Sequence, residues 1–218
     1  MTAIEITTIK GRDIAQHIEA LGRFRIEIFR EFPYVYDGDM SYETKYLSRY
    51  ARCNESLLLL GMDAQGIACA CTGIPLDYEL DEFQLPFLRR GLALADKFYL
   101  GEIMIRKDRR ARGLGTRLLA QALATVAARN CYQQVLLCTV LREPNHALKP
   151  WDYRATYNLW TKFGFEKLAG FDVEFSWKDI GAEVETKKVM ATWVKTLETA
   201  SVVAVGQTRE RVTTEKGV

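Results

Sequence analysis

An apolar strand, a basic turn with two glycines and an amphipathic helix follow one another directly near the middle of this 218-residue chain. The strand spans residues 99–105 (YLGEIMI), and the helix, from about residue 114, places Leu118, Ala122 and Val126 on one face. A buried strand needs neighbouring strands, and an amphipathic helix must cover a surface with its apolar face. The segment therefore predicts a sheet with helices packed on it.

The same two periodicities continue along the rest of the chain. Strands are expected at residues 4–9, in a hairpin formed by residues 56–62 and 67–74, at 99–105 and 133–140, and within 165–175 and 187–194. Helices are expected at residues 14–28, from about 42, at 87–95, from 114 and at 153–164, where Gly164 would end the last one. This order predicts an α/β (α+β) fold in which helices cover a mixed sheet of about seven strands.

Length and composition suit one domain, which we expect to span residues 1–197, because an apolar fraction of 48% can fill one core. Residues 198–218 are polar and lack periodicity, so they are predicted to form a flexible C-terminal tail. The 30 basic and 28 acidic side chains leave a net charge of +2. Such a balance argues against general affinity for nucleic acid.

The distribution of apolar residues and cysteines indicates where in the cell the protein is located and whether it binds a metal. No apolar run approaches the roughly 20 residues that a membrane-spanning helix needs, and the first residues lack the pattern of a secretion signal. The five cysteines show no paired C-x-x-C spacing, so we interpret them as reduced and structural rather than as zinc ligands. We therefore expect a cytoplasmic protein that does not act on a membrane and holds no metal.

The two glycines, Gly113 and Gly115, stand between the central strand and its helix, with the spacing R-x-x-G-x-G counted from Arg110. Glycine lets backbone approach a ligand closely, and the first N–H groups of a helix favour an anion. We interpret the turn as a site for a pyrophosphate, with neighbouring arginines as further donors. The dinucleotide fingerprint lacks its third glycine here, and no Gly-Lys-Ser/Thr tripeptide is present, which excludes both of those phosphate-binding motifs.

Residues 99–123, YLGEIMIRKDRRARGLGTRLLAQAL, resemble the acyl-CoA-binding motif of the GNAT superfamily of N-acyltransferases. LWTKFGF, residues 159–165, is similar to the later helix of that family, which ends in Gly-Phe, and the order of elements resembles the family to about residue 197. The resemblance implies a three-layer fold with a mixed, mostly antiparallel sheet. It also implies direct transfer of an acetyl or other acyl group from acetyl-CoA, or another acyl-CoA, to a primary amine in a ternary complex, without a metal.

The family pattern further implies which residues hold the acyl-CoA. Backbone groups of Ile103, Met104 and Ile105 would bind the pantetheine arm. The residues that would wrap the pyrophosphate are Arg110, Ala111, Arg112, Gly113, Leu114, Gly115 and Thr116. The resemblance also implies a bulge that splays this strand from its neighbour, and it is consistent with a homodimer.

Three residues are candidates for proton transfer. Glu102 is the candidate general base, because a carboxylate in an apolar strand is costly unless it is paired or used; an ion pair with a neighbouring arginine is the open alternative. Trp160 occupies the position where many family members carry a tyrosine, so Tyr157, one turn earlier, is the candidate acid, with packing on the sheet as its alternative. His146, in the loop before this helix, is a second candidate base.

The loop FPYVYDGDMSYE, residues 32–43, combines aromatic rings with carboxylates. We expect Tyr34, Tyr36, Asp37 and Asp39 to bind the acceptor, a small-molecule or protein amine, because both kinds of side chain attract a cation. Glu43 belongs to the same group, and a plain surface turn is the alternative interpretation.

Two other functions stay open at this point. A non-catalytic acyl-CoA-binding or regulatory module on the same fold would explain Trp160 in the place of a tyrosine. Nucleic-acid binding through the basic run at residues 106–117 is less favoured, because no aromatic residues interleave with its arginines.

Overall fold

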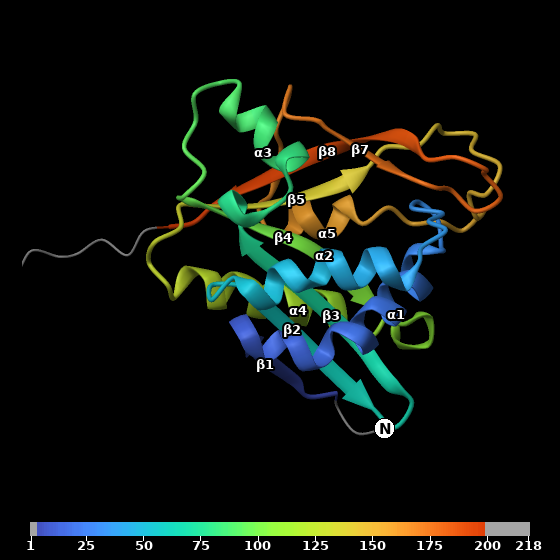
Figure 1. Cartoon of the computed structure of the whole chain (residues 1–218), viewed down its shortest axis with the longest axis horizontal. Helices are drawn as coiled ribbons and strands as arrows, with labels where there is room; N and C mark the ends of the chain where they lie inside the picture. Colours follow the sequence, from blue (N-terminus) through green and yellow to red (C-terminus); the bar gives the residue numbers. More distant parts are fainter. Residues whose placement is uncertain (1–3, 199–218) are drawn as a thin grey trace, which may run out of the picture.

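Strands and helices make up most of residues 4–198, the part of the chain described by a computed structural model (Figure 1). The strands are β1 (Ile6–Lys10), β2 (Leu57–Asp63), β3 (Gly66–Pro75), β4 (Lys97–Ile105), β5 (Gln134–Val140), β6 (Glu166–Lys167), β7 (Val173–Trp177) and β8 (Thr186–Thr196). The α-helices are α1 (Ile18–Phe29), α2 (Met40–Arg52), α3 (Asp81–Leu88), α4 (Leu114–Ala127) and α5 (Tyr157–Lys162), with 3-10 helices at Gly11–His17, Leu76–Tyr78 and Lys107–Arg109. The tail expected at residues 198–218 lies, apart from Glu198, outside the described residues.

All eight strands of the described part belong to one sheet, in the order β1-β2-β3-β4-β5-β8-β6, with β7 also paired to β8. Every pair is antiparallel except β4 with β5. The mixed, mostly antiparallel sheet expected from the sequence is thus confirmed. It has one strand more than expected, because residues 165–175 contain both β6 and the start of β7.

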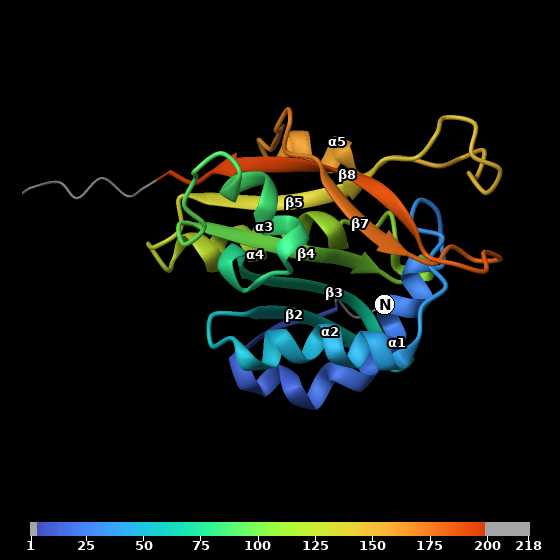
Figure 2. The same ribbon diagram turned by 45° about the horizontal axis from the view of Figure 1, so that its top comes forward.

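Helices cover both faces of the sheet, and strand alternation divides the core between them (Figure 2). Leu57 and Leu59 face the cluster that α4 and α5 close, whereas Leu58 and Leu60 face the one under α1 and α2. A third cluster lies under α3 and β7. The three-layer arrangement is confirmed, and none of the described helices has the length and apolar composition to cross a membrane.

Two helices differ from their expected bounds. The helix expected at residues 87–95 is α3, which lies earlier because Gly91, at φ +67°, ends it with a hydrogen bond from the Leu92 N–H to the Phe87 carbonyl. The helix expected at 153–164 is shortened to α5 at its start. Its end is as expected: Gly164 has φ +77°, and the Phe165 N–H bonds the Trp160 carbonyl.

β4 changes partners halfway along its length. It pairs with β5 only from Lys97 to Leu100, and beyond that point the two strands separate. On its other side, the β3–β4 register shifts between Thr72 and Gly73, which leaves Gly101 as the extra residue of a bulge. The structure therefore contains the splayed, bulged central strand that the family resemblance implies.

Gly101 is tightly enclosed, which leads to a prediction about stability. A Cβ at this position would lie 2.5 Å from the Tyr50 hydroxyl and 3.0 Å from the Thr72 hydroxyl. Gly101→Ala is therefore expected to lower the free energy of unfolding by about 1–3 kcal/mol, measured by urea denaturation. The same substitution in a Tyr50→Phe background should cost less, because the nearest clashing atom is gone; an equal cost in both backgrounds would contradict this explanation.

Candidate functional site

The separation of β4 from β5 opens an elongated groove of about 1790 Å³. Its walls come from β4, β5, the loop before α5 and the end of α1. Beyond Leu100 the β5-facing edge of β4 has no strand partner among the described residues, so its backbone groups face the groove. An extended chain with amide groups, such as the pantetheine arm of an acyl-CoA, can bind such an edge as an added strand would.

The predicted acyl-CoA residues divide between the groove and its surroundings. Ile103, Ile105, Arg110 and Ala111 line the groove. Met104 is fully buried on the opposite face, so only its backbone is available to a ligand. The remaining predicted residues lie beyond the groove lining, in the turn and first helical turn that follow Ala111; they are Arg112, Gly113, Leu114, Gly115 and Thr116.

The glycine turn has the geometry of an anion site. Gly113 is the N-cap of α4 at φ +76°, and a Cβ there would meet no atom within 4 Å, so the turn is open around it. Gly115 is needed for packing, because its Cβ would lie 3.3 Å from Ile105 and 3.4 Å from Leu159. The first N–H groups of α4 have no acceptor within the helix, so this end of the groove fits the pyrophosphate of an acyl-CoA.

Several arginines of the basic run form ion pairs within the protein. Arg106 and Arg109 both bind Asp63, at 2.6 and 2.7 Å. Arg110 binds Glu31 with two hydrogen bonds, at 2.6 and 3.0 Å, and donates from Nε to the backbone of β4. These contacts fix the turn against the rest of the fold, which does not favour a free basic surface for nucleic acid.

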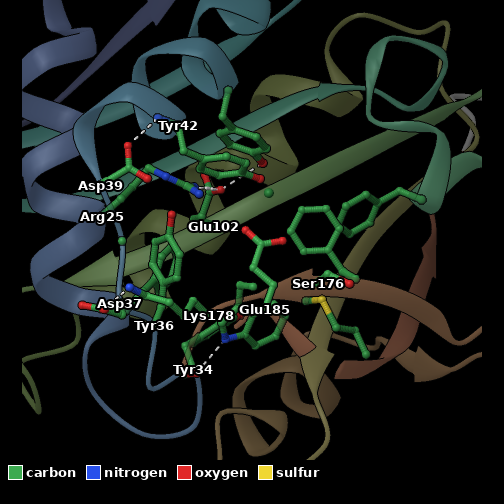
Figure 3. Close-up of a pocket in the computed structure, with 18 of the residues that line it drawn as sticks. Arg25, Tyr34, Tyr36, Asp37, Asp39, Tyr42, Glu102, Ser176, Lys178 and Glu185 are labelled. Carbon is green, nitrogen blue, oxygen red and sulfur yellow. Dashed lines mark hydrogen bonds and ion pairs between the residues drawn. The ribbon is translucent and has the colours of Figure 1, made fainter. Parts of the chain in front are cut away.

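A second cavity, of about 390 Å³, also has Glu102 in its lining (Figure 3). Aromatic rings make up much of its wall, among them Tyr34, Tyr36, Tyr42, Tyr99, Phe175 and Trp177. All four predicted acceptor residues line it, but Asp39 is also occupied as the N-cap of α2, accepting from the backbone of Ser41 and Tyr42 at 2.9 and 3.0 Å. Asp37 pairs with Lys178 at 2.8 Å, and this hydrogen bond lowers the pKa of the Asp37 carboxyl.

Burial changes the acidity of the cavity tyrosines. It raises the pKa of Tyr34 to about 12 and that of Tyr42 to about 12. The pKa of Tyr36 is raised by burial and by the neighbouring Glu43 carboxylate. These hydroxyls are therefore protonated at neutral pH and can act as hydrogen-bond donors.

Glu102 is almost fully buried and lies in a network of side chains from other elements. One carboxylate oxygen accepts from Arg25 and, at 3.1 Å, from the Tyr46 hydroxyl; the other accepts from Thr72. Arg25 also binds Glu43 at 2.5 Å. Burial by itself disfavours the guanidinium charge, but Glu43 outweighs it and the pKa of Arg25 is raised. Arg25 thus contacts two buried carboxyl groups, those of Glu43 and Glu102.

The groove and the cavity meet at a small set of residues. Phe29, Tyr34, Gly101 and Glu102 line both of them. The bulge at Gly101 and the carboxylate of Glu102 thus stand where molecules bound in the two spaces would come into contact. The geometry could therefore bring two bound molecules together at this junction.

The other predicted catalytic residues lie away from this junction. Tyr157 is 51% exposed and lines the groove but not the cavity. Trp160 is 7% exposed and packs in the core beside α4, with its indole nitrogen buried and without a partner among the described residues. His146 lines neither space; its Nδ1 accepts from the Leu148 N–H at 3.2 Å.

The alternative that Glu102 pairs with an arginine agrees with the structure, but the sequence did not identify which arginine or the other partners. Arg25 lies on α1, 77 residues earlier in the chain, and its guanidinium stands 5.0 Å from the Phe29 ring centre and 4.3 Å from that of Tyr46. A signal was present, because Arg25 follows Leu21 by one helical turn on the face that is otherwise apolar. Within residues 4–198 no group of His, Cys, Asp or Glu side chains is arranged to hold a metal.

Residues 24–165 match the acetyltransferase (GNAT) family. The match covers more than half of the chain, so the protein belongs to this family. A comparison with curated proteins finds no match.

Three solved structures with the same fold are those of acetyltransferases, two of them with a bound ligand. Ribosomal-protein-alanine N-acetyltransferase from Brucella melitensis is 14% identical, with a TM-score of 0.58 over 89% of this chain and 100% of that chain. NAA60 from Arabidopsis thaliana in complex with acetyl-CoA is 13% identical, with a TM-score of 0.58 over 89% of this chain and 99% of that chain. A second structure of NAA60 from Arabidopsis thaliana, in complex with a bisubstrate analogue, is 12% identical in sequence. Its TM-score is 0.55 over 90% of this chain and 100% of that chain. At these identities the likeness concerns the fold.

Proposed function

We propose that this protein transfers an acetyl group from acetyl-CoA to a primary amine, by direct attack of the amine on the thioester. The observation that carries the proposal is the meeting of the groove and the aromatic cavity at Gly101 and Glu102. The groove would hold acetyl-CoA, which supplies the acetyl group in activated form, and the cavity would hold the acceptor.

Glu102 is assigned the role of general base. An alkylamine has a pKa near 10.4 in water, so only about one molecule in a thousand is neutral and nucleophilic at pH 7. A carboxylate beside the amine can accept its proton, and Glu102 lines both the groove and the cavity. Backbone N–H groups on the open edge of β4 are available to polarise the carbonyl that is attacked.

Tyr157 is assigned the role of proton donor to the departing thiol. Tyr157 lines the groove and stands on the first turn of α5. Trp160, at the position of the usual tyrosine, also lines the groove but cannot serve, because its buried indole N–H is not acidic.

The cytoplasmic location expected from the sequence is part of this proposal. It is supported by the state of the cysteines, all five of which are free thiols in the structure. Such usage is typical of a reducing compartment.

Binding of acetyl-CoA tests the first half of the proposal. Gly113→Glu places a carboxylate at the turn that would hold the pyrophosphate, so the dissociation constant for acetyl-CoA, measured by calorimetry, is expected to rise about a hundredfold or more. Gly91→Glu is the matched control: Gly91 also has a positive φ, at +67°, and open space around it, but it lies in the loop after α3. Equal weakening in both variants would refute the assignment of the turn.

A non-catalytic acyl-CoA-binding module is the second candidate, favoured by the tryptophan at position 160. Such a module would also lose affinity for acetyl-CoA in the Gly113→Glu variant. Unlike an enzyme, it would bind acetyl-CoA without transferring the acetyl group, so no amine in a broad panel would release CoA faster than uncatalysed hydrolysis does.

A further inference from the structure

The acceptor cavity is closed along one side by two loops that are tied together. Tyr36 forms an isolated antiparallel bridge with Asp179. The Asp37 N–H donates to the Lys178 carbonyl at 2.8 Å, and the Ile180 N–H donates to the Val35 carbonyl at 2.8 Å. This bridge joins the loop before α2 to the connection between β7 and β8.

Arg142 strengthens the same closure. Its guanidinium donates to the Pro33 carbonyl at 2.8 Å and to the Tyr34 carbonyl at 2.5 Å, and it pairs with Asp179 at 2.8 Å. Because the two loops are fixed to each other, an extended polypeptide cannot lie across this side without breaking the bridge. This fixed wall and the volume of about 390 Å³ suit a small molecule.

The outer part of the cavity carries carboxylates that have no cation of their own. Glu183 and Glu185, on the β7–β8 connection, line the cavity and are exposed. Neither side chain forms an ion pair or hydrogen bond with any residue between 4 and 198, whereas Asp37 is paired with Lys178. Figure 3 shows the Glu185 side chain extending from the connection into the space between the aromatic rings.

The same cavity also reaches a buried carboxylate. Glu102 lines the cavity and lies beside Arg25 (Figure 3). Rings that line the same space, such as Tyr99 and Phe175, offer apolar faces to methylene groups and π faces to cations. A ligand with two ammonium groups joined by an apolar spacer can therefore meet a carboxylate with each of its ends.

We propose that the acceptor is a small linear diamine or polyamine. One amine stands at Glu102 and is acetylated, and the second, still charged, is held by Glu183 and Glu185. This inference rests on the proposed acetyltransferase function and names its substrate class.

The test compares two acceptors of equal length, 1,5-diaminopentane and pentylamine, with acetyl-CoA as donor. Wild-type protein is expected to show a kcat/KM about tenfold or more higher for the diamine, because the second ammonium meets two unpaired carboxylates. In the Glu183→Gln/Glu185→Gln double variant this ratio should fall to within about twofold. Raising the salt concentration from about 0.05 to about 0.5 M should lower the wild-type ratio, because exposed charges are screened.

The control is Glu166→Gln/Glu174→Gln, which changes the net charge by the same amount at exposed positions outside both spaces. It should keep the wild-type ratio. A wild-type ratio near one, a ratio that survives in the Glu183→Gln/Glu185→Gln variant, or acetylation of peptide amines in preference to diamines would overturn the inference while leaving the acetyltransferase function standing. Binding of acetyl-CoA with no transfer to any amine would instead refute the proposed function.

Discussion

Glu102→Gln is expected to lower kcat for amine acetylation by about a hundredfold or more at pH 7, with the dissociation constant for acetyl-CoA changed less than about twofold. The amide keeps the shape of the side chain but cannot accept the proton of the ammonium. The loss should shrink as the pH approaches the amine pKa near 10.4, because the acceptor is then deprotonated by solvent. Steady-state rates from pH 6 to pH 10, with release of CoA as the readout, measure both effects.

Glu43→Gln is the matched control for this result. Glu43 makes the same kind of ion pair with Arg25 but lines neither the groove nor the cavity, so its loss should reduce kcat by no more than about tenfold and without the same pH dependence. An equal reduction of kcat in the two variants would show that the ion-paired cluster only stabilises the fold and that Glu102 does not act as a base. Activity that survives Tyr157→Phe but is lost in Glu102→Gln would assign protonation of the thiol to solvent.

Arg25→Met is expected to lower the free energy of unfolding by about 3–5 kcal/mol, because it leaves Glu43 and Glu102 buried without their cation. Both carboxylates are less than 9% exposed, and Arg25 contacts each of them. Denaturant unfolding at constant temperature measures the change. A triple variant that also carries Glu43→Gln and Glu102→Gln should recover much of the stability, since no unpaired charge remains buried.

The free energy of unfolding of the Arg25→Met variant is expected to depend on pH. Without Arg25, no cation offsets the burial of Glu43 and Glu102, so burial favours the neutral carboxyl groups and the native state would bind more protons than the unfolded state. Stability then falls as the pH rises and is regained toward acid. The deficit relative to wild type should be smaller at pH 5 than at pH 8, and a deficit that is independent of pH would contradict the buried ion-pair cluster.

Much of the fold could be predicted because local patterns and tertiary packing agree. The alternation in β2 and β3 and the apolar stripe of α4 are both satisfied by the same sheet. α3 was misplaced because its terminator, Gly91, acts through a positive φ that the sequence pattern did not distinguish from an ordinary loop glycine. α5 was predicted too long at its start for a related reason: residues 153–155 carry helix-compatible side chains but line the groove outside the helix, which begins after its N-cap, Thr156.

The sequence by itself determined the strand–turn–helix unit that carries Glu102 and Gly113, because strand period, glycine spacing and helix amphipathicity are local properties. It also identified the acidic, aromatic loop that the structure places at the cavity. Only the tertiary structure decided that Arg25 is the partner of Glu102 and that the groove and cavity meet at Gly101. Those outcomes depend on which distant segments the sheet order brings together: an ion pair between residues 77 positions apart, and a gap between two strands, exist only after the sheet has formed.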